Sequence, residues 1–239
     1  VMAGFILAQC THAPHVAFAS AIGQSLCQDW GALGVGRIED FWLGKGLMHV
    51  GFVTAAADLL PKYNPKEFFR PAQIDATGSF NNIAFGSDYA RPRIRLPGTG
   101  GIPDVTPTSD HIYLYVPRPS RVVFVERLDF VSGMGHVPQR VSGSGPRYLV
   151  SDLGEFDWQE GTMRLLRHFP GVTVDQIRKK TGFSLKVADP LAETPPPSAT
   201  EVRLLRQDID PLGVRKLEML GGAARKELLR QILATEGAL

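Results

Sequence analysis

The run Ile112–Val116 limits the fold more than any other stretch, because it holds only β-branched, aromatic and aliphatic residues. Such a run is typical of a buried strand. Comparable apolar stretches predict further strands at residues 15–19, 68–75, 80–85, 122–125, 147–150 and 163–169. Because helical segments alternate with these runs, the sequence predicts an α/β domain with a largely buried sheet.

Local signals predict where the helices begin and end. Thr173 and Gln176 have the spacing of a capping box, as do Ser198 and Glu201. The helix that starts at Thr173 is expected to end near Gly182, because glycine tolerates a left-handed cap. Other helices are predicted to end after Phe5–Gln9, to cover Phe52–Leu60 up to Pro61, and to cover Gly222–Glu236.

Composition narrows the classes of function. The 239 residues are 44% apolar and carry a net charge of +2, which argues against binding to a phosphate backbone. No nucleic-acid partner is therefore expected. No run approaches 18 apolar residues, so no membrane partner is expected either. Two cysteines, Cys10 and Cys27, cannot form a disulfide framework, and a cytoplasmic location is expected. Val1 begins in mid-pattern, which suggests that the natural N-terminus is missing.

The segment Gly98-Thr99-Gly100-Gly101 is the most distinctive in the chain. Three glycines in four residues let backbone amides approach a ligand without a Cβ in the way. Such a loop can hold a phosphate or an oxyanion. It matches neither a P-loop nor a dinucleotide fingerprint. The alternative is a tight turn with no ligand.

A second cluster, Ala72–Asn82, gathers amides and a carboxylate around a predicted strand–turn–strand. Gln73 and Asn81 could orient a substrate carbonyl together with Asp75. Asp75 and Asn81 could equally serve only the backbone amides of the turn.

Other polar groups give weaker indications. Arg91, Arg93 and Arg95 alternate and would share one face of a strand, where they could bind phosphates, bind a carboxylate, or simply be solvated. The six histidines lack metal-ligand spacing, so no metal site is predicted. Cys27 has no histidine partner nearby in the sequence, which favours a buried thiol over a nucleophile.

The order of the segments resembles the β subunit of class I coenzyme A transferases of the glutaconate CoA-transferase type. The resemblance runs from about Thr11 to Leu217. It rests on Thr11–Pro14, Ala72–Asp75, Gly98–Gly101, Phe124–Val131, Val150–Gly154, Phe169–Thr173, Thr181–Phe183 and Asp208–Pro211. It implies a largely parallel buried sheet flanked by helices, in one domain over residues 1–217. Residues 218–239 would form a C-terminal helical tail.

One departure from the family pattern concerns catalysis. The family's nucleophilic Glu position falls on Ala21, within Ser20-Ala21-Ile22-Gly23. A transferase needs a carboxylate that attacks the thioester and carries CoA, and alanine has no such atom. A register slip of one residue would place Ser20 or Ile22 there, and neither replaces Glu.

Two further departures affect the expected acyl pocket. Arg70-Pro71 and Gly78–Asn81 both differ from the family pattern, which suggests a reshaped pocket. Arg70 is a candidate partner for a substrate carboxylate, and it should be exposed or paired.

The resemblance therefore implies a subunit acting on an acyl-CoA. The pattern is closest to Glu-less members such as the cholesterol ring-cleaving acyl-CoA hydrolase, with the catalytic base on an α subunit. Residues Gly98–Gly101 would line the thioester path, Gln73, Asp75 and Asn81 would position the acyl part, and Ala21, Ile22 and Gly23 would leave space. Alternatives are a true CoA-transferase using Asp29 or a partner's Glu, an acyl-CoA decarboxylase, and a non-catalytic scaffold. An αβ or (αβ)₂ assembly is expected, with CoA as part of the substrate and no permanent cofactor.

Overall fold

The computed structural model describes residues 1–20, 24–36, 44–140 and 142–239. They form two compact units, the first of Val1–Lys62 with Pro197–Leu239 and the second of Tyr63–Pro196. The expected division into a domain over 1–217 and a tail over 218–239 differs from these units and stays a prediction. No helix in the described ranges is long and apolar enough to cross a bilayer.

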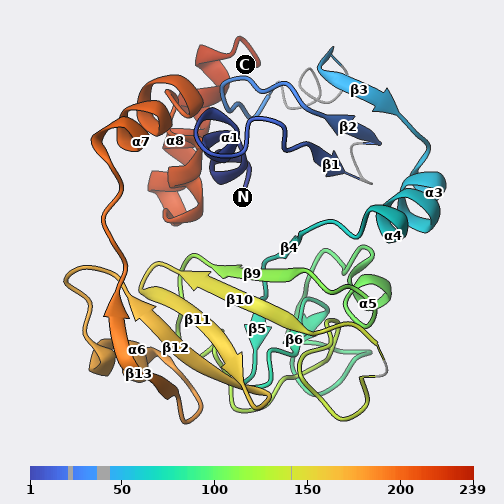
Figure 1. Ribbon diagram of the computed structural model, residues 1–239, viewed down its shortest axis with the longest axis vertical. Coiled ribbons are helices and arrows are strands. Elements are labelled where there is room, and N and C mark those ends of the chain that lie inside the picture. Colours follow the sequence, from blue (N-terminus) through green and yellow to red (C-terminus); the bar gives the residue numbers. More distant parts are fainter. Residues whose placement is uncertain (21–23, 37–43, 141) are drawn as a thin grey trace. The chain divides into compact units, whose positions relative to one another are not determined.

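The second unit is built on a six-stranded sheet of order β13-β12-β11-β10-β9-β4 (Figure 1). Its strands are β4 (Glu67–Phe69), β9 (Ile112–Val116), β10 (Pro146–Ser151), β11 (Gly154–Gln159), β12 (Thr162–His168) and β13 (Lys186–Glu193). The pairings β4–β9, β9–β10 and β12–β13 are parallel, while β10–β11 and β11–β12 are antiparallel hairpins. The predicted α/β fold with a largely parallel central sheet is therefore confirmed.

One face of this sheet is covered by the apolar core of the unit. In β9, Ile112, Leu114 and Val116 point inward and are buried, and the tyrosines between them are half-buried. This alternation places a continuous apolar layer against the rest of the unit. The core residues are Ile74, Phe80, Ile102, Ile112, Leu114, Val116, Phe124, Leu149, Phe156, Met163, Leu165, Ile177 and Leu185.

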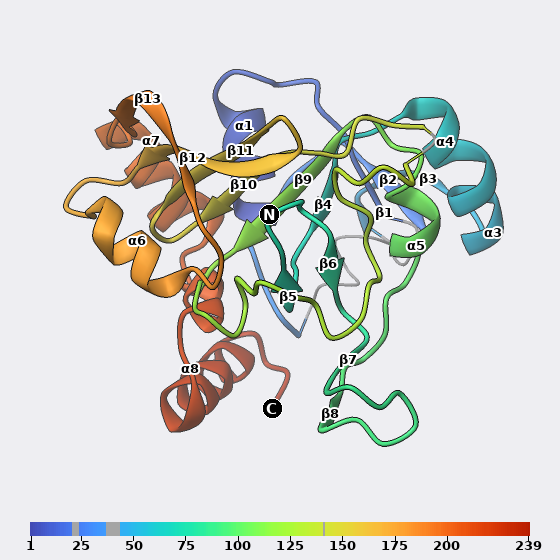
Figure 2. The same cartoon turned by 90° about the horizontal axis from the view of Figure 1, so that it is seen from below.

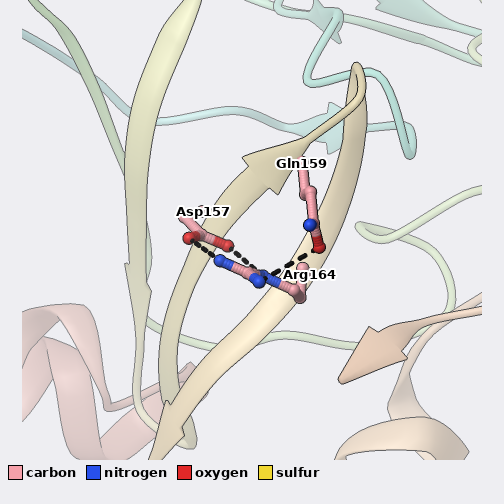
Figure 3. A network of polar contacts seen from close by, with 3 residues as sticks. All are labelled: Asp157, Gln159 and Arg164. Carbon is pink, nitrogen blue, oxygen red and sulfur yellow. Dashed lines mark hydrogen bonds and ion pairs between the residues drawn. The ribbon is translucent and has the colours of Figure 1, made fainter. Parts of the chain in front are cut away.

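Cross-strand pairs order the opposite face of the sheet. Phe68 stacks on Tyr113 with ring centroids 5.3 Å apart, and Tyr113 stacks on Tyr148 at 6.2 Å. On the β11–β12 hairpin, Arg164 lies directly across from Asp157. Its Nε and Nη2 donate to the two carboxylate oxygens at 2.9 and 2.6 Å, and its Nη1 donates to Gln159 Oε1 (Figure 3). Such pairs fix the register of neighbouring strands.

Short elements lie against the buried face of the sheet (Figure 2). They are β5 (Gln73–Ile74) paired with β6 (Phe80–Asn81), and helices α5 (Ile102–Val105) and α6 (Val174–Lys180). Farther from the sheet, β7 (Ala84–Phe85) pairs with β8 (Ile94–Arg95) (Figure 2). The predicted strands over 68–75 and 80–85 are thus broken into shorter pieces around the predicted turn. β8 and α5 were not predicted, because they fall in a Gly/Pro-rich segment.

The prediction of a strand at Val122–Val125 is wrong. Both Val123 and Phe124 donate to the carbonyl of Ser120, which makes this segment a turn. Its only ladder-like contact among the described residues is with Ile74, which donates to the Val123 carbonyl at 2.7 Å and accepts from Val125 at 2.9 Å. A buried apolar turn can therefore have the same composition as a buried strand, so the sequence pattern alone does not distinguish them.

The two predicted capping boxes are confirmed. Thr173 accepts from the Gln176 amide while Gln176 caps the Thr173 amide, and Ser198 and Glu201 do the same. The left-handed end predicted at Gly182 is wrong. The cap residue Thr181 is extended, and a Cβ on Gly182 would lie 2.4 Å from the Phe124 carbonyl oxygen. Glycine is needed there for close backbone approach.

The first unit contains a small antiparallel sheet and several helices. Its elements are α1 (Met2–Cys10), β1 (Phe18–Ser20), β2 (Ser25–Cys27), β3 (Gly46–His49), α3 (Phe52–Thr54), the π-helix η1 (Ala55–Leu59), α4 (Leu60–Tyr63), α7 (Ala199–Arg203), the π-helix η2 (Leu204–Ile209), the 3₁₀ helix η3 (Val214–Glu218) and α8 (Gly222–Thr235). Glu236, just after α8, accepts from the amides of Val35 and Gly36. This links the C-terminal helix to the loop after β2.

Two predictions in the first unit need correction. The strand expected to be buried at residues 15–19 begins only at Phe18 and is half-exposed, because β1 is an edge strand. The helix expected to stop at Pro61 continues to Tyr63. The π-turn before Pro61, in which Leu60 donates to Ala55, widens the helix where a proline ring would otherwise clash. Cys27 is buried, as predicted.

We expect Gly182→Ala to lower the free energy of unfolding by about 1–3 kcal/mol, because the added methyl overlaps the Phe124 carbonyl. Urea denaturation followed by far-UV circular dichroism measures this change. Gly4→Ala is the control, since it adds the same methyl inside α1 with no atom within 4 Å. Equal midpoints for Gly182→Ala and the unsubstituted chain would contradict the assigned contact.

Candidate active site

The predicted site residues divide between described and undescribed parts of the chain. Ala21, Ile22 and Gly23 lie outside the described residues. On either side of them, Ser20 and Ser25 pair in the β1–β2 ladder. The remaining predicted site residues all lie in the second unit: Arg70, Gln73, Asp75, Asn81, Gly98, Thr99, Gly100 and Gly101.

A buried pair of carboxamides forms the centre of the site. Gln73 on β5 and Asn81 on β6 lie directly opposite each other, with exposed fractions of 5% and 0%. Asn81 Nδ2 donates to Gln73 Oε1 at 2.7 Å and to the Ala84 carbonyl at 2.8 Å, and Asn81 Oδ1 accepts from the Ile83 amide. Both N–H donors of the Asn81 side chain are therefore used within the protein.

Gln73 differs from Asn81 because its donor end is not used. Its Oε1 also accepts from the Asp129 backbone amide at 3.2 Å. A backbone N–H can only donate, so the atom that faces it must be the oxygen. The Nε2 group then points away from these partners and donates to no described residue. Of the two carboxamides, Gln73 is the one that can bind a substrate oxygen.

Asp75 organises the turn between β5 and β6. Its Oδ1 accepts from the Thr77 amide, the Thr77 hydroxyl and the Ser79 amide at 2.7–3.2 Å. These are the turn contacts foreseen as the alternative to a substrate role. Burial raises the pKa of the Asp75 carboxyl, although these hydrogen bonds act in the opposite direction.

The glycine loop presents backbone donors to solvent. Gly98 and Gly100 have φ angles of +120° and +55°, and no heavy atom lies within 4 Å of the position of either Cβ. The glycines are therefore needed for the backbone conformation and not for space. The amides of residues 98–101 donate to no described residue, and the three glycines are exposed. The loop leads directly into α5, which starts at Ile102.

Hydrogen bonds link the segments before and after the glycine loop to the neighbourhood of the carboxamide pair. Before the loop, Leu96 donates to the Ile83 carbonyl at 3.0 Å, and Ile83 itself donates to Asn81. After the loop, the Thr106 hydroxyl accepts from the Met134 amide at 3.0 Å. Two residues before Met134, Ser132 Oγ accepts from the Asn82 amide. These bonds join the segments that flank the two predicted motifs.

Arg70 lies at the entrance to β5 and is exposed, and its guanidinium has no partner among the residues that the structure describes. Its backbone carbonyl accepts from Asn82 Nδ2 at 3.2 Å. Asn82 Oδ1 also accepts from the Ala72 amide. The backbone of Arg70 is thus held in place while its guanidinium remains available to a ligand.

Two residues that organise this region were not predicted. Asp129 links Gln73 to the β7–β8 hairpin, because its Oδ2 accepts from the Gly86 amide at 2.9 Å. Arg140 donates to the carbonyls of Pro107, Met134, Gly135 and Ser142, which joins the segment after α5 to residues on both sides of Arg140. Asp129 stands in a segment matched to the family, but neither residue has a local pattern that indicates its partners.

The arrangement favours binding of a carbonyl or thioester group over acid–base chemistry. The available donors are the loop amides, Gln73 Nε2 and the Arg70 guanidinium, all suited to an oxygen that gains negative charge. Within the described ranges, no group of three or more His, Cys, Asp or Glu residues is placed to hold a metal ion.

We expect Asn81→Ala to lower the free energy of unfolding by about 2–4 kcal/mol, because it leaves buried backbone groups of Ile83 and Ala84 without partners. Chemical denaturation of the two chains measures the difference. Gln159→Ala, on an exposed strand end, should change stability by less than about 0.5 kcal/mol. A loss for Asn81→Ala no larger than that for Gln159→Ala would contradict the role of Asn81.

Asp75→Asn should stabilise the chain increasingly as the pH rises. A carboxyl whose pKa is higher in the folded than in the unfolded state binds more protons when folded, so its stabilising contribution is lost as pH rises through the folded pKa. Asparagine keeps an oxygen acceptor for the turn and does not titrate. Unfolding free energies from pH 4 to 7 measure the difference between the two chains. A difference that is constant, or that shrinks with pH, would show that burial does not dominate.

Comparison with known proteins yields consistent relatives, although no family model matches the chain. It is 29% identical over 180 residues to the β subunit of the 3-oxoadipate CoA-transferase of Pseudomonas knackmussii, covering 72% of this chain and 62% of that protein. It is 33% identical over 156 residues to the cholesterol ring-cleaving hydrolase IpdB subunit of Rhodococcus jostii, covering 62% and 60%. The β subunit of the glutaconate CoA-transferase of Acidaminococcus fermentans matches at 29% over 154 residues, covering 60% and 56%.

Solved structures agree over more of the chain. The crystal structure of the decarboxylase AibA/AibB superposes with a TM-score of 0.75 at 29% identity, covering 90% of this chain and 85% of that one. The structure of Rhodococcus jostii IpdAB gives 0.75 at 27% identity, with the same coverage. This chain spans less than two thirds of the length of the relatives matched by sequence. Fold, motif order and relatives coincide, and the chain belongs to the class I CoA-transferase family as a β subunit.

Proposed function

We propose that this chain is the β subunit of an α/β enzyme that hydrolyses an acyl-CoA, with the catalytic base on the α subunit. The observation that carries the proposal is Ala21, which stands where the family pattern has its nucleophilic Glu. A covalent glutamyl–CoA intermediate needs a carboxylate at that position. Without it, water is the simplest nucleophile, and the substrate is a cyclic or dicarboxylic acyl-CoA cleaved at its thioester or at a C–C bond.

The second unit supplies the donors that such a reaction needs. Attack of water on the thioester, and C–C cleavage beside it, both place negative charge on the thioester oxygen. The amides of residues 98–101 and Nε2 of Gln73 are available to stabilise that charge. The guanidinium of Arg70 suits a carboxylate elsewhere on the acyl group. Asp75 and Asn81 act on the substrate only by holding Gln73 and the turn.

An α subunit completes the site in this proposal, as an αβ or (αβ)₂ assembly. Support comes from the relatives, since IpdAB and AibA/AibB each carry two subunit names. Coenzyme A enters as part of the substrate, and the proposal requires no permanently bound cofactor.

CoA transfer is the second candidate function. It is favoured by the similarity to the β subunits of the 3-oxoadipate and glutaconate CoA-transferases. In that case the carboxylate would be Asp29, which is exposed two residues after β2, or a Glu of the partner. Decarboxylation has comparable structural support from AibA/AibB.

Intact-protein mass spectrometry of the α/β complex, incubated with a panel of acyl-CoAs, tests the proposal. We expect no CoA adduct on this chain, together with steady formation of a hydrolysed or ring-cleaved product. Chromatography coupled to mass spectrometry follows the small molecules in parallel. A CoA adduct on a carboxylate, or transfer of CoA to a second acid, would replace the proposal with the transferase function. Loss of CO₂ alone would replace it with decarboxylation.

The same assay distinguishes a catalytic subunit from a scaffold. Gln73→Ala should lower kcat/KM by about 100-fold, as expected for loss of one oxyanion donor. Thr99→Val should also lower it if the loop contacts substrate, and Gln159→Ala should not. Unchanged activity in both Gln73→Ala and Thr99→Val would indicate a non-catalytic scaffold.

A further inference from the structure

The β7–β8 hairpin, residues 84–95, is the most strongly charged element near the candidate site and has no role in the chemistry above. Ala84 pairs with Arg95 and Phe85 with Ile94, and the backbone amide of Arg93 donates to the Phe85 carbonyl at 2.8 Å. The hairpin projects from the second unit (Figure 2). We refer to it as the arginine hairpin.

Its charge is uncompensated within the described residues. Residues 86–95 contain Arg91, Arg93 and Arg95 against one carboxylate, Asp88. All three arginines are exposed, and no described carboxylate forms an ion pair with any of them. Asp88 instead accepts from the Ala90 amide at 2.9 Å and shapes the loop. The hairpin therefore offers two guanidinium groups, those of Arg91 and Arg93, with free donors.

The aromatic side chain of Tyr89 lies in the same hairpin loop and is fixed by its neighbours. The Arg95 guanidinium carbon lies 4.3 Å from the centroid of the Tyr89 ring, and Arg95 Nη2 donates to the Tyr89 carbonyl. Phe130 meets the same ring edge-on at 5.9 Å. Tyr89 nevertheless remains 62% exposed. An exposed ring fixed by two neighbours is a ready platform for stacking a planar base.

The hairpin is fastened to the candidate site at both of its ends. At the start of its loop, the Gly86 amide donates to Asp129 Oδ2 at 2.9 Å, and the Asp129 amide donates to Gln73 Oε1. At its end, only Leu96 and Pro97 separate Arg95 from Gly98, a span of at most about 11 Å. A ligand that contacts the glycine loop and extends along the hairpin would therefore meet Tyr89 and the arginines.

We propose that the arginine hairpin binds the phosphorylated adenosine end of the CoA thioester, with Arg91 and Arg93 on phosphate groups and Tyr89 under the adenine. The inference rests on the proposed function, in which the thioester itself lies at the glycine loop. A planar guanidinium forms paired hydrogen bonds with phosphate oxygens. The combination of free guanidinium groups and an exposed aromatic ring matches a nucleotide better than a carboxylate, which would need only the charges.

Binding measurements on the assembled α/β complex test the proposal without knowledge of the acyl group. The probes are CoA, adenosine 3′,5′-bisphosphate and pantetheine, with affinities measured by isothermal titration calorimetry. We expect Arg91→Ser/Arg93→Ser to lower the affinities for CoA and for the bisphosphate by roughly 10- to 100-fold, because charge-assisted hydrogen bonds are lost. Pantetheine, which lacks both phosphates and base, should bind unchanged.

Substitutions at Tyr89 test the stacking contact separately. Tyr89→Ala should lower the affinity for the bisphosphate by about tenfold, because the stacking ring is lost. The complex with Tyr89→Phe keeps a ring and should bind the bisphosphate as tightly as the unsubstituted complex. Lys179→Ser is the control for loss of charge, because Lys179 is exposed on α6 and has no assigned partner in the described part of the chain. It should leave all three affinities unchanged.

The outcomes separate this proposal from the proposed function. If Arg91→Ser/Arg93→Ser binds CoA with unchanged affinity, or if its affinity for pantetheine falls as much as its affinity for CoA, the hairpin does not hold the nucleotide and only this proposal fails. If the double variant no longer assembles with the α subunit, as judged by size-exclusion chromatography, the hairpin is a subunit interface and the proposal is overturned. If the unsubstituted complex binds no CoA, the proposed function fails as well.

Discussion

The hydrogen bond between Gln73 and Asn81 is the constraint on which the candidate site depends. It joins two strands of only two residues each, β5 and β6, which could not hold their register by ladder bonds alone. Through Ile83 and Leu96 it sets the start of the glycine loop, and through Asp129 it sets the start of the arginine hairpin. Because a buried carboxamide without partners is costly, the pair favours the arrangement of the neighbouring segments in which both side chains are bonded.

The parts of the fold that the sequence predicts well depend on neighbours within a few residues. Thr173 and Ser198 cap their helices because the partner residue lies three positions away. Ile112–Val116 is a strand because its β-branched and aromatic residues favour a buried, extended segment. By contrast, β11 was not predicted, since it carries charged residues on the face where Asp157 meets Arg164 of the next strand. Val122–Val125 has the composition of a strand, but hydrogen bonds to Ser120 and Ile74 make it a turn within the core.

The same distinction applies to the candidate site. Residue types alone indicate Gln73, Asp75 and Asn81 as a polar cluster and Gly98–Gly101 as a separate loop, and in the structure hydrogen bonds join the segments that flank them. Residue types do not show which hydrogen-bonding groups are already bonded within the protein. Both N–H donors of Asn81 are used, whereas Gln73 keeps a free donor, and the direction of the Asp129 amide reveals this difference. Arg140 was missed because its four carbonyl partners are contributed by separate loops, one of them distant in the sequence.

The donors in the second unit also bear on where proton transfer must originate. Besides Asp129, whose Oδ2 accepts from the Gly86 amide, the described residues of the candidate site hold one carboxylate, that of Asp75. Its Oδ1 already accepts three hydrogen bonds from its own turn, and moving that group toward a substrate would break them. Amides and guanidinium groups stabilise negative charge but do not remove a proton from water. Hydrolysis at this site therefore needs a base beyond the described site residues of the second unit, which is the division of labour expected if the α subunit supplies it.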